Sequence, residues 1–163
     1  MKRLILVLLP ILFLTSCQNV QYHHKQQQQL EELEAQLMNG SLTQSSTFPF
    51  QFDLTLSKGD NDIQYQLTFQ DFETAMYDVK IVVKALDEDS DIVSFGFDEN
   101  QTVNIIPFQE NEKKGYYGSI SLKGRISDVS GRLGVIFQWQ DVSSVTSYQR
   151  YIEINCADYS VSE

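Results

Sequence analysis

The densest group of carboxylates in the chain has the spacing of a calcium-binding loop. Asp87, Asp89 and Asp91 alternate as the first three ligands of such a loop do, and Asp98 stands at its twelfth position. Ile92, however, occupies the position that needs glycine, and an alternating strand pattern resumes directly after it. The favoured interpretation is a solvated hairpin tip, with the three aspartates as candidate calcium ligands.

The region from residue 48 to residue 163 contains no histidine. Ser-His-Asp catalysis, Cys-His catalysis and the usual zinc sites need that side chain, so this region does not supply them by itself. It also lacks a glycine-rich phosphate loop and a nucleophile elbow. A carboxylate-based enzyme acting on envelope glycan stays open as an alternative, because two such acids need only be close in space. We expect no enzyme activity and no cofactor.

Aromatic side chains could bind a sugar ring or a protein partner if several shared an exposed face. Trp139, Tyr116 and Tyr148 fall on the inward phase of their predicted strands. Tyr117 and Tyr151 fall on the outward phase of two different strands. These two tyrosines are therefore the candidate interaction surface, and a carbohydrate-binding module is an alternative function.

A cysteine ends the apolar N-terminal stretch of the chain. Two basic residues are followed by an apolar run from Leu4 to Leu14. This run is shorter than the roughly 20 residues of a transmembrane helix, but it has the size and the basic flank of a signal-peptide core. The residues that follow, Leu14-Thr15-Ser16-Cys17, resemble the lipobox of bacterial lipoproteins: one aliphatic residue, two small residues and the cysteine.

The resemblance covers the first 17 residues and implies a defined processing. A type II signal peptidase would cut between Ser16 and Cys17, and Cys17 would carry a diacylglyceryl group on its sulfur. One acyl chain anchors a protein only marginally, whereas two or three hold a soluble domain firmly. The resemblance therefore implies an extracytoplasmic protein that is lipid-anchored to the cell membrane or the outer membrane.

The charge of the chain is strongly negative. Lys and Arg number 12 against 22 Asp and Glu, which gives a formal net charge of −10. Removal of Lys2 and Arg3 with the signal peptide takes this charge from −10 to −12. A surface of this sign repels phosphate backbones and anionic lipid headgroups. Nucleic-acid binding is therefore disfavoured, and attachment to a membrane needs the lipid.

The segment after Cys17 predicts a short helix. Good helix formers dominate residues 25–38, where Leu30, Leu33 and Leu37 form a narrow apolar stripe. Asn39-Gly40 is a typical helix stop. Two heptads are fewer than a coiled coil needs, so a solvated or loosely docked stalk helix is the favoured interpretation.

Beyond this segment the pattern changes to strict alternation of apolar and polar residues. "FPFQFDLTL" and "IQYQLTFQ" alternate in this way, and the turn-rich "SKGDND" between them predicts a hairpin. The pattern continues to Ile154 as about eight short strands, without helices for parallel crossovers. We expect an all-β fold, an antiparallel β-sandwich of immunoglobulin-like type, with a small antiparallel β-barrel as the alternative.

The second cysteine, Cys156, has no partner for a disulfide if Cys17 carries lipid. The alternation of the last long strand places Cys156 on its inward face. We therefore expect a buried and inert thiol.

These expectations divide the chain into three parts. Residues 1–16 are a cleaved lipoprotein signal peptide, residues 17–47 a lipidated N-terminus with a helical stalk and linker, and residues 48–163 a β-sandwich domain. The expected function is that of a lipoprotein that presents a binding or interaction module to a protein partner in the envelope or outside the cell. Its partners are then the membrane, through the diacylglyceryl cysteine, and that protein.

Overall fold

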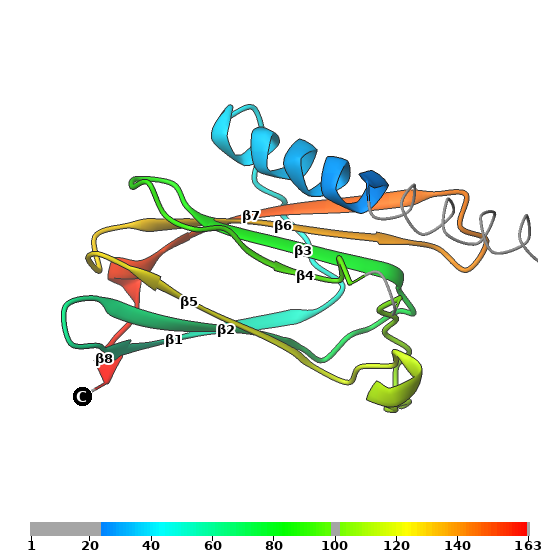
Figure 1. Ribbon diagram of the computed structural model, residues 1–163. Coiled ribbons are helices and arrows are strands. Elements are labelled where there is room, and N and C mark those ends of the chain that lie inside the picture. The colour runs from blue at the N-terminus through cyan, green and yellow to red at the C-terminus, as the bar shows by residue number, and fades with distance from the viewer. Residues whose placement is uncertain (1–23, 99–101, 163) are drawn as a thin grey trace, which may run out of the picture.

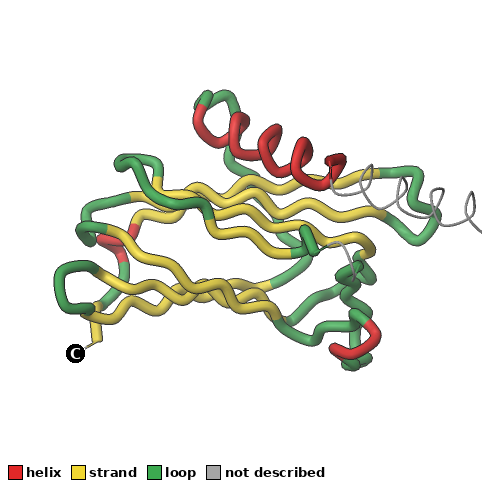
Figure 2. The backbone as a smooth tube through the Cα atoms, viewed as in Figure 1, coloured by secondary structure: helices red, strands yellow, loops and turns green. Residues whose placement is uncertain are grey.

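Two four-stranded sheets lie face to face in the computed structural model, with one helix outside the second sheet (Figures 1 and 2). The structure describes residues 24–98 and 102–162. The first sheet has the order β5-β2-β1-β8, with the strands β1 (Gln51–Lys58), β2 (Ile63–Gln70), β5 (Ile120–Ile126) and β8 (Val161–Ser162). The second sheet has the order β4-β3-β6-β7, with the strands β3 (Tyr77–Ala85), β4 (Val93–Phe95), β6 (Arg132–Gln140) and β7 (Ser147–Asn155). Two short 3₁₀ helices are η1 (Glu112–Lys114) and η2 (Cys156–Asp158).

The strand order is that of an immunoglobulin-like sandwich. Neighbouring strands pair antiparallel, except β8, which pairs parallel with β1 at the edge of the first sheet. The chain changes sheets after β2, β4, β5 and β7, which produces a Greek-key arrangement of two separate sheets. The expected β-sandwich is confirmed, and the two sheets do not close into the β-barrel that was the alternative.

The connections define two ends of the sandwich. The β2–β3, β4–β5 and β6–β7 connections leave one end, which we call the β6–β7 end. The β1–β2, β3–β4 and β5–β6 turns lie at the opposite end, together with the C-terminus, as Figure 1 shows.

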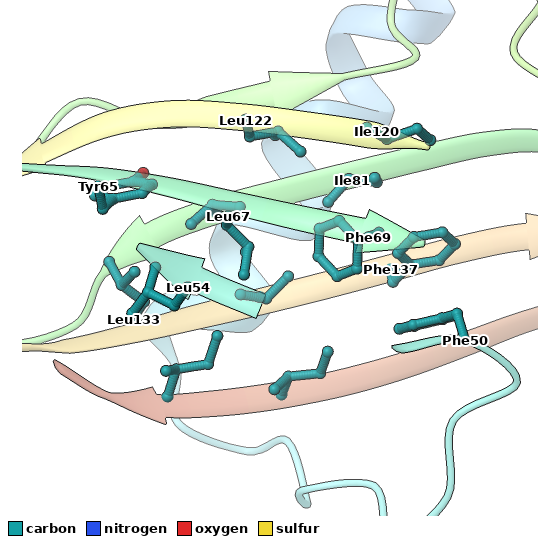
Figure 3. Close-up of a cluster of buried hydrophobic side chains, with 14 of the residues drawn as sticks. Phe50, Leu54, Tyr65, Leu67, Phe69, Ile81, Ile120, Leu122, Leu133 and Phe137 are labelled. Atoms are coloured by element: carbon teal, nitrogen blue, oxygen red, sulfur yellow. The ribbon is translucent and has the colours of Figure 1, made fainter. Parts of the chain in front are cut away.

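One apolar core fills the space between the sheets (Figure 3). Alternate residues of β1 and β2 point into it, as the sequence pattern predicts. Phe69 and Phe137 are fully buried, with ring centroids 5.1 Å apart, and the Phe50 ring lies 4.4 Å from that of Phe137. Each such side chain contributes about 1.5–3 kcal/mol by leaving water, so the paired inner faces hold the two sheets together.

The second sheet departs from strict alternation because it is buried on both faces. Every residue of β3 from Val79 to Ala85 is buried, and β6 is buried continuously from Leu133 to Phe137. A sheet with one wet face would expose every second residue. The cover on the outer face is the N-terminal helix.

This helix, over residues 24–38, packs its leucine stripe on the outer face of the second sheet. Leu33 and Leu37 are 2% and 3% exposed. The buried members of this second apolar cluster are Leu33, Leu37, Val82, Ile136 and Tyr151. Gly134 of β6 permits the close approach, since a Cβ atom there would lie 3.1 Å from Cδ2 of Leu37.

Polar contacts fix the direction of the helix across the sheet. Near its start, Gln29 donates a hydrogen bond to the side chain of Gln138 at 2.7 Å. Farther along, Nζ of the buried Lys84 lies 3.4 Å from a carboxylate oxygen of Glu34. The described part of the helix therefore begins at the β6–β7 end and runs toward the opposite end.

The linker of residues 41–47 follows the edge of β7 instead of leaving the surface. The Ser45 amide donates to the Tyr151 carbonyl at 3.0 Å, and the Tyr151 amide donates to Oγ of Ser45 at 3.2 Å. An exposed strand edge is a template for unwanted pairing, and the linker covers it here.

The helix and the linker are thus part of the folded unit, and the expectation of a solvated or loosely docked stalk is wrong. The sequence showed the apolar stripe of the helix but not the surface that receives it. That surface is assembled from single apolar residues on the outward phase of β3, β6 and β7, namely Val82, Ile136 and Tyr151.

The expected burial of the second cysteine is confirmed. Cys156 begins η2, is fully buried and forms no disulfide. Burial raises the pKa of its thiol to about 11. Because the thiolate is the reactive form, this cysteine is inert at neutral pH.

The helix contact predicts a large effect of one leucine on stability. Leu33→Ala should lower the free energy of unfolding by about 2–4 kcal/mol, because it leaves a cavity between the helix and the sheet. Glu31→Ala, on the exposed side of the same helix, should change it by less than about 0.5 kcal/mol. Urea unfolding of the two variants measures both values. Equal effects of the two substitutions would contradict a docked helix.

The buried thiol predicts a slow reaction with thiol reagents. In the native chain, Cys156 should react with a disulfide reagent at least about 100-fold more slowly than in denaturant, because its side chain is shielded and protonated. An Asn61→Cys variant, with the new thiol in the exposed β1–β2 turn, provides the fast native reference. The burial is wrong if Cys156 and the thiol at position 61 react at the same rate in the folded protein.

Candidate functional site

An aromatic hollow of about 460 Å³ opens at the β6–β7 end of the sandwich. Its walls come from the segment before β1, the β2–β3 connection and the ends of β6 and β7. The residues that shape it include Pro49, Ala75, Tyr77, Trp139, Tyr148 and Arg150. We call this hollow the aromatic pocket.

Two strand ends position the aromatic wall of the pocket. Trp139 on β6 and Tyr148 on β7 are a directly opposed pair, and their rings stack with centroids 5.3 Å apart and an angle of 16°. Such pairs contribute about 0.5–1.5 kcal/mol beyond the area that they bury. The guanidinium of Arg150, two residues along β7, lies 5.5 Å from the centroid of a Trp139 ring. The Trp139 ring is thus covered and only 4% exposed.

Tyr148 remains accessible although its strand phase is inward. It is 40% exposed, and Tyr116 is half-buried outside the core cluster, so of the three inward-phase aromatics only Trp139 lies in the core as expected. The sandwich opens at this end, so an inward side chain among the first residues of β7 faces the pocket and not the opposite sheet. Tyr148 is therefore the aromatic surface that a ligand would meet.

Hydrogen bonds hold Arg150 in place beside the pocket. Its Nε donates to the carbonyl of Thr47 at 3.1 Å, and its Nη1 donates to the carbonyl of Gln149 at 2.9 Å. The Thr47 bond also ties the end of the linker to β7. Arg150 thus supplies a fixed positive charge at the rim of a mostly apolar hollow.

The β6–β7 loop, residues 141–146, forms one side of the pocket and is organised by Asp141. One Asp141 carboxylate oxygen accepts hydrogen bonds from the amide and hydroxyl of Ser143, at 3.1 and 2.7 Å, and from the amide of Val145 at 3.3 Å. These bonds, that of the Ser143 hydroxyl first, lower the pKa of Asp141. The loop's two apolar side chains point outward, with Val142 78% and Val145 83% exposed.

The side chains that line the aromatic pocket suit ligand binding better than catalysis. Asp141 is the only carboxylate among the described residues that line it, and its lowered pKa keeps it ionised. A general acid needs a raised pKa, and a glycosidase dyad needs a second carboxylate across a cleft. The pocket lining described here offers an aromatic face, small apolar surfaces and one cation.

A second hollow, also of about 460 Å³, lies under the first turns of the helix and is lined mainly by amide side chains. Gln29 bonds across it to Gln138. Lys80, 3% exposed, extends from the outer face of β3 to this hollow, with its Nζ 2.8 Å from the Asp78 carboxylate. These groups join the helix to the sheet, so their first role is structural.

The predicted interaction pair, Tyr117 and Tyr151, does not form a surface. Tyr151 is 8% exposed because the helix covers it, and burial is the main cause of the raised pKa of its hydroxyl. Tyr117 is half-buried and packs edge-on against Phe95, with ring centroids 5.4 Å apart. The outward phase was correct for Tyr151, but the expectation that it is accessible is wrong. The outward phase was wrong for Tyr117, which precedes β5 and packs against the core between the sheets.

The acidic run between β3 and β4 joins this loop to a neighbouring segment through hydrogen bonds and an ion pair. Asp87 accepts from the Arg132 amide and Nε at 3.0 Å and pairs with its Nη2 at 2.6 Å, and this hydrogen bonding lowers the pKa of Asp87. Asp89 and Asp91 stay at the surface, and β4 begins two residues later as a paired strand that carries the chain away. Within residues 24–98 and 102–162, no three His, Cys, Asp or Glu side chains are placed to hold a metal ion. Asp87, Asp89 and Asp91 are not gathered into a calcium loop.

The predicted processing positions, Ser16 and Cys17, lie outside the described residues. In the part of the chain that the structure describes, no helix has the length and apolar character to cross a bilayer.

The sequence reasoning missed the residues that matter most here. Tyr148 was assigned to the core, and Arg150 and the β6–β7 loop were not singled out. The available signal was the stretch "QDVSSVTSYQR", in which two valines interrupt a polar hairpin loop where alternation gives them no core to enter.

No protein-family model and no curated protein matches the chain. Among solved structures, a chain titled "Crystal structure of Br derivative BhCBM56" is similar over 69% of this chain and 99% of that chain, with 13% sequence identity and a TM-score of 0.34. Similarity at this level carries no argument about this chain's function.

Proposed function

We propose that this chain is an extracytoplasmic lipoprotein, anchored through Cys17 to a bacterial cell membrane or outer membrane, whose sandwich binds a protein partner in the envelope. The anchor is supported by the basic residues, apolar run and Leu14-Thr15-Ser16-Cys17 motif at the N-terminus. The proposal that the sandwich binds a partner is supported by the aromatic pocket, in which the Tyr148 ring is accessible.

The composition of the pocket favours a protein ligand. Trp, Tyr and Arg are the residues enriched at the energetic centres of protein interfaces, and Trp139, Tyr148 and Arg150 stand together here. The rigid stack presents the Tyr148 ring without a further loss of side-chain freedom. An apolar side chain of a partner would pack on this ring, with the Arg150 guanidinium beside it.

A sugar ligand has less support from the same geometry. Sugar rings stack on open aromatic faces. Tyr148 and Arg150 cover the Trp139 ring, which is 4% exposed, so the largest aromatic face of the pocket is already occupied. The carboxylate-pair enzyme has no second acid in the described pocket lining.

The anchor is tested by Cys17→Ala. Wild-type protein from its native membrane should have a mature N-terminal peptide that begins at Cys17 and carries thioether-linked acyl chains. The variant should accumulate as an unprocessed, unlipidated precursor. Mass spectrometry of both N-terminal peptides decides the point, and an unmodified mature N-terminus in wild type would rule out the anchor.

The pocket is tested by cross-linking on intact cells. A photo-cross-linking residue at Tyr77, on the pocket wall, should give a discrete adduct with one envelope protein. Adding Tyr148→Ala should weaken that interaction about 10–30-fold, the usual loss at an interface hot spot. Adding Phe108→Ala, which removes a fully exposed ring outside the pocket, should leave the adduct unchanged. The pocket is not the binding site if both substitutions have the same effect, and release of the adduct by soluble glycan would indicate a carbohydrate ligand instead.

A further inference from the structure

The chain between the anchor and the folded unit is short. Cys17 and His24, the first described residue of the helix, are seven residues apart. Seven residues span about 25 Å at most, whatever conformation they adopt. If Cys17 is held in the bilayer surface, the start of the helix lies within that distance of it.

The first described turn of the helix is held beside the end of β6. Lys25 and Gln26, in its first turn, line the same hollow as Gln140, the last residue of β6. The Gln29–Gln138 hydrogen bond holds this part of the helix on the strand. Figure 1 shows the first turns of the helix (dark blue) at the end where β6 turns into β7, with the C-terminus at the opposite end.

The exposed apolar side chains gather at this same end. Six large hydrophobic side chains are exposed among the described residues, and four of them lie in the connections or strand ends at the β6–β7 end. These four are Phe108, Val142, Val145 and Tyr148. Val142 and Val145 belong to the β6–β7 loop, which directly follows Gln140.

The β6–β7 loop also presents little charge to a lipid surface. Asp141 is its only ionisable residue, and loop amides and a hydroxyl already surround that carboxylate. Ser143, Ser144 and Thr146 complete the loop with uncharged side chains. The densest acidic run, residues 87–91, lies in the β3–β4 connection at the opposite end. Anionic headgroups repel such a run.

From these observations we infer that the β6–β7 end of the sandwich rests on the lipid surface that holds Cys17, with Val142 and Val145 in contact with lipid. This inference depends on the proposed anchor. The valines lie in the headgroup and upper acyl region, where exposed apolar side chains are stabilised. The aromatic pocket then opens close to the membrane, so that its partner is a protein at the membrane surface, and the acidic C-terminal end points away from the membrane.

The test uses the full lipidated chain in nanodiscs of phosphatidylethanolamine and phosphatidylglycerol, with a nitroxide-labelled lipid as the probe. Amide resonances of residues 142–146 should be broadened by the nitroxide at least fivefold more than those of residues 59–62 and 87–91 at the opposite end. A double variant, Val142→Ser with Val145→Ser, should reduce this difference by at least half. Val161→Ser, an exposed valine at the opposite end, is the matched control and should leave it unchanged.

The outcomes separate the orientation from the anchor. Lipidated protein that stays in the nanodisc while residues 142–146 are broadened no more than residues 59–62 would overturn the inference and leave the anchor intact; the valines would then face a protein partner. Absence of acyl chains on Cys17 removes the anchor and, with it, the inference. Both substituted sites are exposed, so an unchanged melting temperature shows that the variants report contact and not folding.

Discussion

The contact of Leu33 and Leu37 with Val82, Ile136 and Tyr151 is the constraint on which the rest of this structure depends. The second sheet carries apolar residues on both faces, and its outer face cannot be left in water without cost. The helix removes that face from water, and Gly134 lets it come close enough to do so. Its direction then decides at which end of the sandwich the first described residues of the helix lie.

The same contact explains why polar residues of the second sheet are buried. Lys84 lies on the covered face and finds its partners in Glu34 of the helix and the carbonyl of Ser90. Lys80 is buried near the start of the helix and pairs with Asp78. A buried ammonium without a partner would be strongly destabilising, so helix and sheet supply these pairs together. The helix is thus held by apolar packing in its middle and by polar contacts along its length.

The β6–β7 end combines a rigid loop with an accessible ring. The Asp141 carboxylate holds the β6–β7 loop by accepting hydrogen bonds from amides of that loop. The stacked side chains of Trp139, Tyr148 and Arg150 fix the neighbouring wall. Because neither feature needs a ligand to form, the surface is preorganised for binding. Asp141, the single carboxylate in the described lining of the aromatic pocket, is stabilised in the ionised form, which suits a recognition surface better than acid–base catalysis.

The sequence by itself determined the fold class, the position of the helix along the chain and the burial of Cys156, because strand and helix periods and turn residues are local properties. It could not determine what covers each face. Tyr151 has the outward phase but lies under the helix, and Tyr148 has the inward phase but lies where the sandwich opens. Asp87 has the spacing of a calcium ligand but binds Arg132, 45 residues away. The alternation of apolar and polar residues assigns a side chain to one face of its strand. Whether that side chain is exposed, and which residue it contacts, depends on segments far apart in the sequence, and only their packing in the tertiary structure decides this.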